Sequence, residues 1–178
     1  TSEYVSIERG FMGIIRKPNL SDVPDIKRLL DDAVALGSVL PRELAELYES
    51  IRDFYVYIDA GGILGGCVAL HIDMEDLAEI RSLVVVESMR GQSIGQRLVD
   101  AAIAEAQSLN IARVYVLTRA TEFFDKNDFF VVEHHVLPHK VFKDCIRCRL
   151  FPGCDEIAMV RDLPRIKEDC AEATAMAS

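Results

Sequence analysis

The sequence has no apolar run long enough to cross a membrane. A membrane-spanning helix needs about 20 predominantly apolar residues in a row, and every apolar run in this chain is much shorter. A charged start followed by an apolar segment, the pattern of a secretory signal, is also missing. The chain begins at Thr1, so a trimmed leader stays open. These absences favour a cytoplasmic protein.

Positive charge is scarce as well. Twenty Lys and Arg residues face 29 Asp and Glu residues, and the formal net charge is -9. Such a balance argues against nucleic acid as the main partner, because the phosphate backbone is bound by basic surfaces. Internal repeats and low-complexity linkers are not visible either. We expect one domain over residues 11–162, with a loose segment at 1–10 and a frayed tail at 163–178.

The five cysteines are an odd number without secretory context, which predicts free thiols rather than a disulfide framework. Cys145, Cys148 and Cys154 form a Cys-x-x-Cys-x5-Cys pattern with His139 upstream. Zinc and iron–sulfur sites need such clustering, but here a fourth ligand must be borrowed from a neighbouring His or Asp. We therefore expect no metal. A metal site at these cysteines, or a switchable Cys145–Cys148 disulfide, remains an alternative.

Apolar periodicity predicts the order of helices and strands. A helix capped by Ser21 and Asp22 should end at Gly37, and a second should begin at Pro41 or Arg42. Further helices are expected at 94–109 and 121–126, and strands at 11–16, 54–58, 63–72, 77–86, 111–117, 129–133 and 156–160. Hairpins come first and an α/β crossover follows. This order predicts an α/β fold of the mixed α+β type, with a mostly antiparallel sheet and helices on both faces.

One stretch, Arg90-Gly91-Gln92-Ser93-Ile94-Gly95, joins a buried strand to a helix. The start of a helix leaves backbone N–H groups unpaired and carries partial positive charge, which suits a phosphate. Gly91 and Gly95 let the backbone approach such a ligand, and Arg90 adds charge. The alternative is an ordinary strand–turn–helix with a surface Arg. A kinase-type P-loop is excluded, because no Gly-Lys-Ser/Thr follows the turn.

The succession of strand, Arg-Gly-x-x-Ile-Gly turn, helix and strand resembles the GNAT superfamily of acyl-CoA N-acetyltransferases. The usual turn in that superfamily reads Gln/Arg-x-x-Gly-x-Gly/Ala. Arg90 and Gly95 match it, and Ser93 stands where the first Gly is expected. The resemblance covers residues 11–162 in element order and implies the GNAT-like fold and acetyl-CoA as co-substrate.

A later GNAT segment, Ala-x-x-(Phe/Leu)-Tyr-x-x-x-Gly-Phe, is matched in part. Ala120, Phe123 and Phe129 fit it, whereas Phe124 replaces the Tyr and Asp128 replaces the Gly. In many GNAT enzymes this Tyr protonates the departing thiolate. The resemblance therefore leaves the general acid open between Thr118, a water molecule and departure of CoA as the thiolate.

Scattered segments look like the acetyltransferase domain of bacterial N-acetylglutamate synthases: residues 40–42, 54–56, 67–71, 77–81 and 117–119. The chain would be a short form without the kinase-like domain of the long synthases. The resemblance implies direct, acetyl-CoA-dependent acetylation of the α-amine of L-glutamate, in arginine biosynthesis. Another amine acceptor, or a non-catalytic module that binds acyl-CoA or an amino acid, stays open. So does a homodimer.

The resemblance also implies which residues hold acetyl-CoA. The backbone N–H groups of residues 92–96 would hold the pyrophosphate. The pantetheine arm would lie along strand residues 83–85, where a backbone N–H would polarise the thioester carbonyl. The expected set is Leu83, Val84, Val85, Arg90, Gly91, Gln92, Ser93, Ile94, Gly95 and Gln96.

Glu79 is the expected base, because it lies four residues before Leu83 and shares its face if no bulge intervenes. The alternative is a solvated Glu paired with Arg81. A dicarboxylic acceptor would need cations, and guanidinium groups bind carboxylates in a bidentate manner. Arg42, Arg81 and Arg119 are the expected acceptor-binding residues, with Arg42 first among them.

Overall fold

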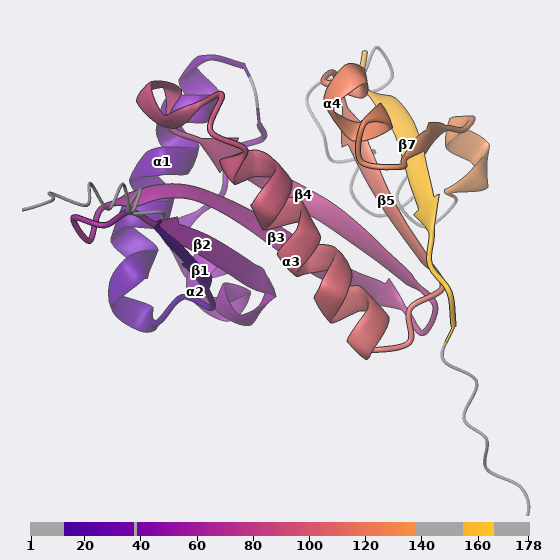
Figure 1. The fold of residues 1–178 in the computed structure, drawn as a ribbon, viewed down its shortest axis with the longest axis horizontal. Coiled ribbons are helices and arrows are strands. Elements are labelled where there is room, and N and C mark those ends of the chain that lie inside the picture. Colours follow the sequence, from indigo (N-terminus) through magenta and orange to yellow (C-terminus); the bar gives the residue numbers. More distant parts are fainter. Residues whose placement is uncertain (1–12, 38, 138–154, 166–178) are drawn as a thin grey trace, which may run out of the picture. The chain divides into compact units, whose positions relative to one another are not determined.

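The computed structural model describes residues 13–37, 39–137 and 155–165. The chain divides into two compact units, one of residues 1–72 and 79–103 and the other of residues 73–78 and 104–178. Helices and strands follow the predicted order (Figure 1). Cys145, Cys148, Cys154 and His139 lie outside the described residues.

Most of the first unit is built from four strands and two helices. They are β1 (Ile14–Arg16), α1 (Val23–Ala35), α2 (Leu44–Glu49), β2 (Phe54–Ile58), β3 (Leu64–Met74) and β4 (Leu77–Val85), where β4 begins in the second unit. Helix α3 (Ile94–Ser108) starts here and ends in the second unit. The strand order is β1-β2-β3-β4. β1 pairs antiparallel with β2, and β2 antiparallel with β3.

The second unit contains β5 (Arg113–Thr118), α4 (Thr121–Asp125), β6 (Phe130–Val131) and β7 (Ile157–Asp162). Their order is β5-β7-β6, and both pairings are antiparallel. The predicted mixed fold with mostly antiparallel strands is therefore confirmed. The strand expected at 129–133 is shorter than predicted. No helix of the described residues is long and apolar enough to cross a bilayer.

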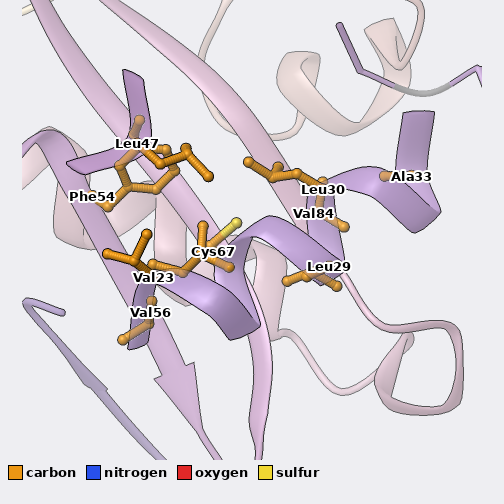
Figure 2. Close-up of a cluster of buried hydrophobic side chains, with 11 residues drawn as sticks. Val23, Leu29, Leu30, Ala33, Leu47, Phe54, Val56, Cys67 and Val84 are labelled. Atoms are coloured by element: carbon orange, nitrogen blue, oxygen red, sulfur yellow. The ribbon is translucent and has the colours of Figure 1, made fainter. Parts of the chain in front are cut away.

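Helix α1 packs its predicted apolar side against the sheet of the first unit. Val23, Ile26 and Leu30 are at most 1% exposed. They contact the side chains that β2, β3 and β4 present on the same face, among them Val56 and Cys67 (Figure 2). On the opposite face, a Cβ at Gly66 would lie 3.1 Å from Leu98 of α3. Helices thus cover both faces of this part of the sheet.

The two helix starts follow the prediction only in part. Asp22 is the N-cap of α1, as expected, but its side chain makes no capping hydrogen bond to α1. It closes the preceding 3₁₀ turn Leu20–Asp22 instead, where Asn19 accepts from the Ser21 N–H and Asp22 accepts from the Asn19 N–H. Helix α2 begins at Leu44 rather than at Pro41 or Arg42, with a capping box formed by Glu43 and Glu46. A carboxylate accepts from backbone N–H groups, so the helix starts where that acceptor is available. The end at Gly37, with φ 70°, is as predicted.

Candidate active site

Strand β4 is continuous over Leu77–Val85, but its backbone is irregular at Ser82. This residue has φ 55°, in the left-handed region that non-glycine residues rarely adopt. Its carbonyl accepts from the buried thiol of Cys67 at 3.4 Å. A left-handed residue breaks the alternation of side chains along a strand. The expectation that Glu79 and Leu83 share a face required a regular strand, and that condition is not met.

The backbone around β4 and β3 is tightly packed just after this irregularity. The Val86 N–H donates to the Gly65 carbonyl at 2.9 Å. A Cβ at Gly66 would lie 3.0 Å from the Val84 carbonyl, so the absence of a side chain permits the approach. Val84 is buried in the core that faces α1. The side chain therefore serves packing, and any ligand would have to meet the backbone of this stretch.

The turn from β4 to α3 contains the residues that were expected to hold the pyrophosphate. A 3₁₀ turn at Glu87–Met89 is followed by Arg90, whose side chain donates to the Val85 carbonyl at 3.2 Å. Gly91 has φ 78° and is exposed. The first turn of α3 carries no acidic residue, so its N–H groups face no nearby carboxylate from their own turn.

Ser93 stands where the GNAT pattern expects Gly, and its backbone is left-handed. Its φ is 58°, and Asp128, the other residue that replaces an expected Gly, has φ 62°. Both positions need a left-handed backbone, which Gly adopts without strain. Ser93 still ends the turn correctly, because its carbonyl accepts from the Arg97 N–H at 3.1 Å. Ile94 is buried and anchors the helix start, while Gly95 and Gln96 are half-buried.

Glu79 is buried, with 3% of its surface exposed, and lies beside Arg81. The distance from Arg81 Nη1 to Glu79 Oε2 is 3.8 Å, and from Arg81 Nη2 to Asp53 Oδ2 it is 4.0 Å. The alternative of a solvated Glu at a strand edge is wrong, although its pairing with Arg81 is present. A carboxylate is a group that can act as a general base toward an ammonium group.

Asp53 and His71 extend this cluster, and sequence reasoning missed Asp53. His71 Nδ1 lies 3.0 Å from Asp53 Oδ2. The two side chains are each 27% exposed. Asp53 ends the 3₁₀ turn Ile51–Asp53 just before β2, and His71 lies near the end of β3. Since 18 residues separate them, no local pattern could have paired them.

Arg42, the first acceptor-binding candidate, also belongs to the first unit. It is half-buried and lies just before Glu43, the N-cap of α2. Cys67, by contrast, is a packing residue. Burial raises the pKa of its thiol from 9.0 to about 12, which keeps it protonated and unreactive at neutral pH.

Thr118 and Arg119 belong to the second unit. Thr118 is 8% exposed, and its hydroxyl accepts from the Ala120 N–H at 2.9 Å. Arg119 donates to Asp155 at 2.8 Å through Nε and lies 3.9 Å from Glu156. This hydrogen bond lowers the pKa of the Asp155 carboxyl. The guanidinium of Arg119 is therefore engaged by the chain's own carboxylates.

Phe124, which replaces the Tyr of the GNAT pattern, is a core residue of the second unit. It is 3% exposed and packs edge-to-face with Phe123 and Phe129, at centroid distances of 5.1 and 5.3 Å. It has no proton to donate. Within the described residues no group of three or more His, Cys, Asp or Glu side chains could hold a metal. The expected cysteine alternative lies outside that part of the chain.

Comparison with known proteins places these features in a family. The model of the acetyltransferase (GNAT) family matches residues 26–129, which include the whole of β4, the turn after it and α3. The chain belongs to this family. The matched range contains the turn at residues 90–95 and the segment at residues 120–129 on which the resemblance was based.

Relatives of this GNAT chain carry more specific names. A Chlorobaculum tepidum protein named an uncharacterized N-acetyltransferase is 37% identical over 149 residues, which are 84% of this chain and 96% of that protein. A Mycobacterium tuberculosis amino-acid acetyltransferase is 38% identical over 136 residues, 75% of this chain and 78% of that protein.

A solved structure of a longer protein has a similar fold. N-acetylglutamate synthase from Neisseria gonorrhoeae, complexed with coenzyme A and N-acetyl-glutamate, superposes with a TM-score of 0.77 at 28% identity. The match covers 86% of this GNAT chain but 35% of the synthase. The similarity is thus to one part of a longer protein.

Proposed function

We propose that this chain is an acetyl-CoA-dependent N-acetyltransferase whose acceptor is the α-amine of an amino acid, with L-glutamate as the first candidate. The M. tuberculosis relative is named an amino-acid acetyltransferase, and the Neisseria synthase holds coenzyme A and N-acetyl-glutamate. Glutamate as acceptor assigns the enzyme to arginine biosynthesis. The short chain corresponds to the acetyltransferase part of the longer synthases.

The observation that carries the proposal is the Glu79–Arg81 pair on the strand that leads into the GNAT turn. Glu79 is a buried carboxylate that can take a proton from an ammonium group. Arg81 has a side chain only 14% exposed, and within the described residues its guanidinium has ion-pair partners at 3.8 and 4.0 Å but no hydrogen bond. Buried donors of this kind usually have partners, so an incoming carboxylate suits them.

An α-amino acid offers both complementary groups, an ammonium for Glu79 and a carboxylate for Arg81. Polyamines have no carboxylate, and a protein N-terminus has none next to its amine. The second carboxylate of glutamate needs another cation. Arg42, in the same unit, is the candidate for it. It comes first because the segment Leu40-Pro41-Arg42 resembles that of the synthases. Arg119, which donates to Asp155, comes second.

Acetyl transfer is direct in this proposal. The deprotonated amine attacks the thioester carbonyl, the new C–N bond forms, and the C–S bond breaks. The first ammonium proton goes to Glu79, directly or through water. The second is lost when the tetrahedral intermediate collapses, and it passes through water to the departing CoA thiolate, so that the amide and free CoA are formed. Backbone N–H groups of residues 92–96 hold the pyrophosphate, and an N–H near Leu83 or Val84 polarises the carbonyl.

A thiol-release assay tests the function. The purified protein is mixed with acetyl-CoA and each proteinogenic amino acid in turn, with spermidine and a short peptide as acceptors of other classes. We expect release with L-glutamate to exceed release with the neutral amino acids and with both other classes. Release with the peptide or spermidine alone would contradict the amino-acid acceptor. If no amine causes thiol release, the proposed enzymatic function itself is contradicted.

A further inference from the structure

Four charged or titratable side chains form a connected row in the first unit. His71 of β3 lies 3.0 Å from Asp53, Asp53 lies 4.0 Å from Arg81, and Arg81 lies 3.8 Å from Glu79. Exposure decreases along the row, from 27% for the His71 and Asp53 side chains to 14% for Arg81 and 5% for Glu79. The row therefore runs from the partly exposed end toward the buried base.

Arg81 is held differently from other arginines of the described residues. Arg16 makes two hydrogen bonds to Asp22, at 2.8 and 3.0 Å, and Arg113 makes one to Asp162 at 2.6 Å. Both contacts of Arg81 are longer than a hydrogen bond. The guanidinium thus lies between two carboxylates at nearly equal distances rather than on one of them.

Of the two carboxylates near Arg81, Glu79 is the closer one, so a small movement of the guanidinium would form a hydrogen bond to Glu79. Side chains two residues apart on a strand project from the same face. A guanidinium and a carboxylate so placed can close into a bidentate pair. Closure would occupy the oxygen atoms of the base and the donors that an acceptor carboxylate needs. An opposing attraction from Asp53, at 4.0 Å, keeps the pair open.

We propose that Asp53 is a positioning residue that holds Arg81 away from Glu79 and so keeps the acceptor site open. The inference rests on the proposed function, because it assigns Asp53 to the same acceptor site. Asp53 acts through Arg81 and touches neither substrate nor the reacting atoms. Position 53 requires an acidic residue, because only an ionised carboxylate attracts the Arg81 guanidinium strongly enough to oppose the attraction of Glu79.

His71 fixes the carboxylate of Asp53. An ionised carboxylate can only accept a hydrogen bond, so the Nδ1 atom of His71 carries the proton in this contact. The bond at 3.0 Å anchors the same Oδ2 atom that faces Arg81. Asn at position 71 can present an amide N–H close to the place of Nδ1, whereas Ala cannot. His71→Asn should therefore retain the hydrogen bond to Asp53, which His71→Ala loses.

The first test is structural and needs no activity. In a crystal structure of Asp53→Asn, we expect the Arg81–Glu79 distance to shorten from 3.8 Å to hydrogen-bond length, about 2.8 Å. A distance that stays unchanged overturns the proposal. This result is independent of the proposed function, so an inactive wild-type protein would contradict the function alone.

The second test is a double-mutant cycle. Asp53→Asn should lower kcat by roughly 10- to 100-fold, as misplacement of a reacting group by about 1 Å can do. It should also raise the acceptor KM, with the acetyl-CoA KM unchanged. In an Arg81→Gln background, Asp53→Asn should add nothing, because the residue acts through Arg81. Additive losses overturn the proposal.

Matched variants separate positioning from folding. Asp22→Asn removes another Asp–Arg ion pair of the same unit and should leave kcat and both KM values unchanged. His71→Ala should reproduce the Asp53→Asn effect in weaker form, and His71→Asn should restore most of the activity. If Asp53→Asn fails to fold, the two His71 variants decide the question: equal activity of both overturns the proposal.

Discussion

The thiol of Cys67 donates to the carbonyl of Ser82 at 3.4 Å, which ties the core of the first unit to the irregularity in β4. Cys67 is fully buried, and burial raises the pKa of its thiol from 9.0 to about 12. The folded protein therefore keeps the Cys67 thiol protonated. Burial of this thiol thus makes stability depend on pH in the alkaline range.

Above pH 9 the unfolded chain should lose the Cys67 proton while the folded chain keeps it up to about pH 12. The folded state then binds more protons, so the free energy of unfolding falls as pH rises through this window, by about 1.4 kcal/mol per pH unit. Below pH 9 the contribution is fully present. Urea titrations between pH 7 and about 10.5 measure the slope.

The variant Cys67→Ala is the control for that slope. It should be less stable at pH 7, because it loses buried contacts and the bond to Ser82, but its stability should lose less between pH 9 and pH 10.5. Equal slopes in both proteins would show that Cys67 ionises as easily folded as unfolded. Native protein should also resist thiol reagents at Cys67.

Much of the fold could be predicted from local patterns. The apolar spacing of Val23, Ile26 and Leu30 predicts both α1 and its buried side, and glycine at position 37 marks its end. The irregularity of β4 was not predictable, because a single Ser in the left-handed region leaves no periodic signal. Ser82 lies between Glu79 and Leu83, so the regular alternation that would place these two side chains on one face does not hold across it.

The candidate site also contains some features that local sequence patterns predict and others that they do not. The GNAT turn is contiguous in sequence, so its residue types together with the order of strand, turn and helix predict an anion-binding loop. The pairing of Glu79 with Arg81 could be considered because they lie two residues apart on one strand. Asp53 joins them only through the folding of the sheet, and its residue type is common on surfaces. Tertiary structure was required to find it.

Ser93 occupies a backbone conformation that costs a non-glycine residue free energy. With φ 58°, replacement by Gly should relieve about 1–2 kcal/mol of strain, offset in part by the entropy that Gly loses on folding, about 0.5–1 kcal/mol. We expect Ser93→Gly to raise the free energy of unfolding by about 0.5–1 kcal/mol. Denaturant unfolding measures the change, and acetyl-CoA affinity should stay the same.

Gly91 gives the opposite test in the same turn. It has φ 78°, and an added Cβ would meet nothing within 4 Å, so strain of the backbone is the only cost. Gly91→Ala should lower the free energy of unfolding by about 1 kcal/mol. If Gly91→Ala and Ser93→Gly change the free energy of unfolding in the same direction, one of the two residues does not have a left-handed backbone.

Glu79→Gln removes the proposed base while keeping shape and burial. General base catalysis contributes about 10²- to 10⁴-fold, so kcat should fall by that order. Acetyl-CoA affinity should stay nearly intact, because the turn after β4 is unchanged. Glu122→Gln, at an exposed position of α4, is the control and should have wild-type kcat. Wild-type turnover in Glu79→Gln would remove this residue as the base.

Arg81 and Arg119 should respond differently to replacement by Ala, although both were expected to bind the acceptor. Arg81 has no hydrogen bond within the described residues, whereas Arg119 is engaged by Asp155 at 2.8 Å. A hydrogen bond to a charged group contributes about 1.5–3 kcal/mol, so Arg81→Ala should raise the glutamate KM roughly 10- to 100-fold. Arg119→Ala should leave that KM within about twofold, because the guanidinium of Arg119 already donates to Asp155.

Arg42→Ala completes this comparison. If Arg42 binds the second carboxylate, its loss should raise the KM for glutamate but leave the KM for an amino acid without a side-chain carboxylate unchanged. Arg81→Ala should raise both, because every amino acid has the α-carboxylate. Arg28→Ala, at an exposed position of α1 paired with Asp25, is the control. A rise in the acetyl-CoA KM alone would place Arg42 with the donor rather than with the acceptor.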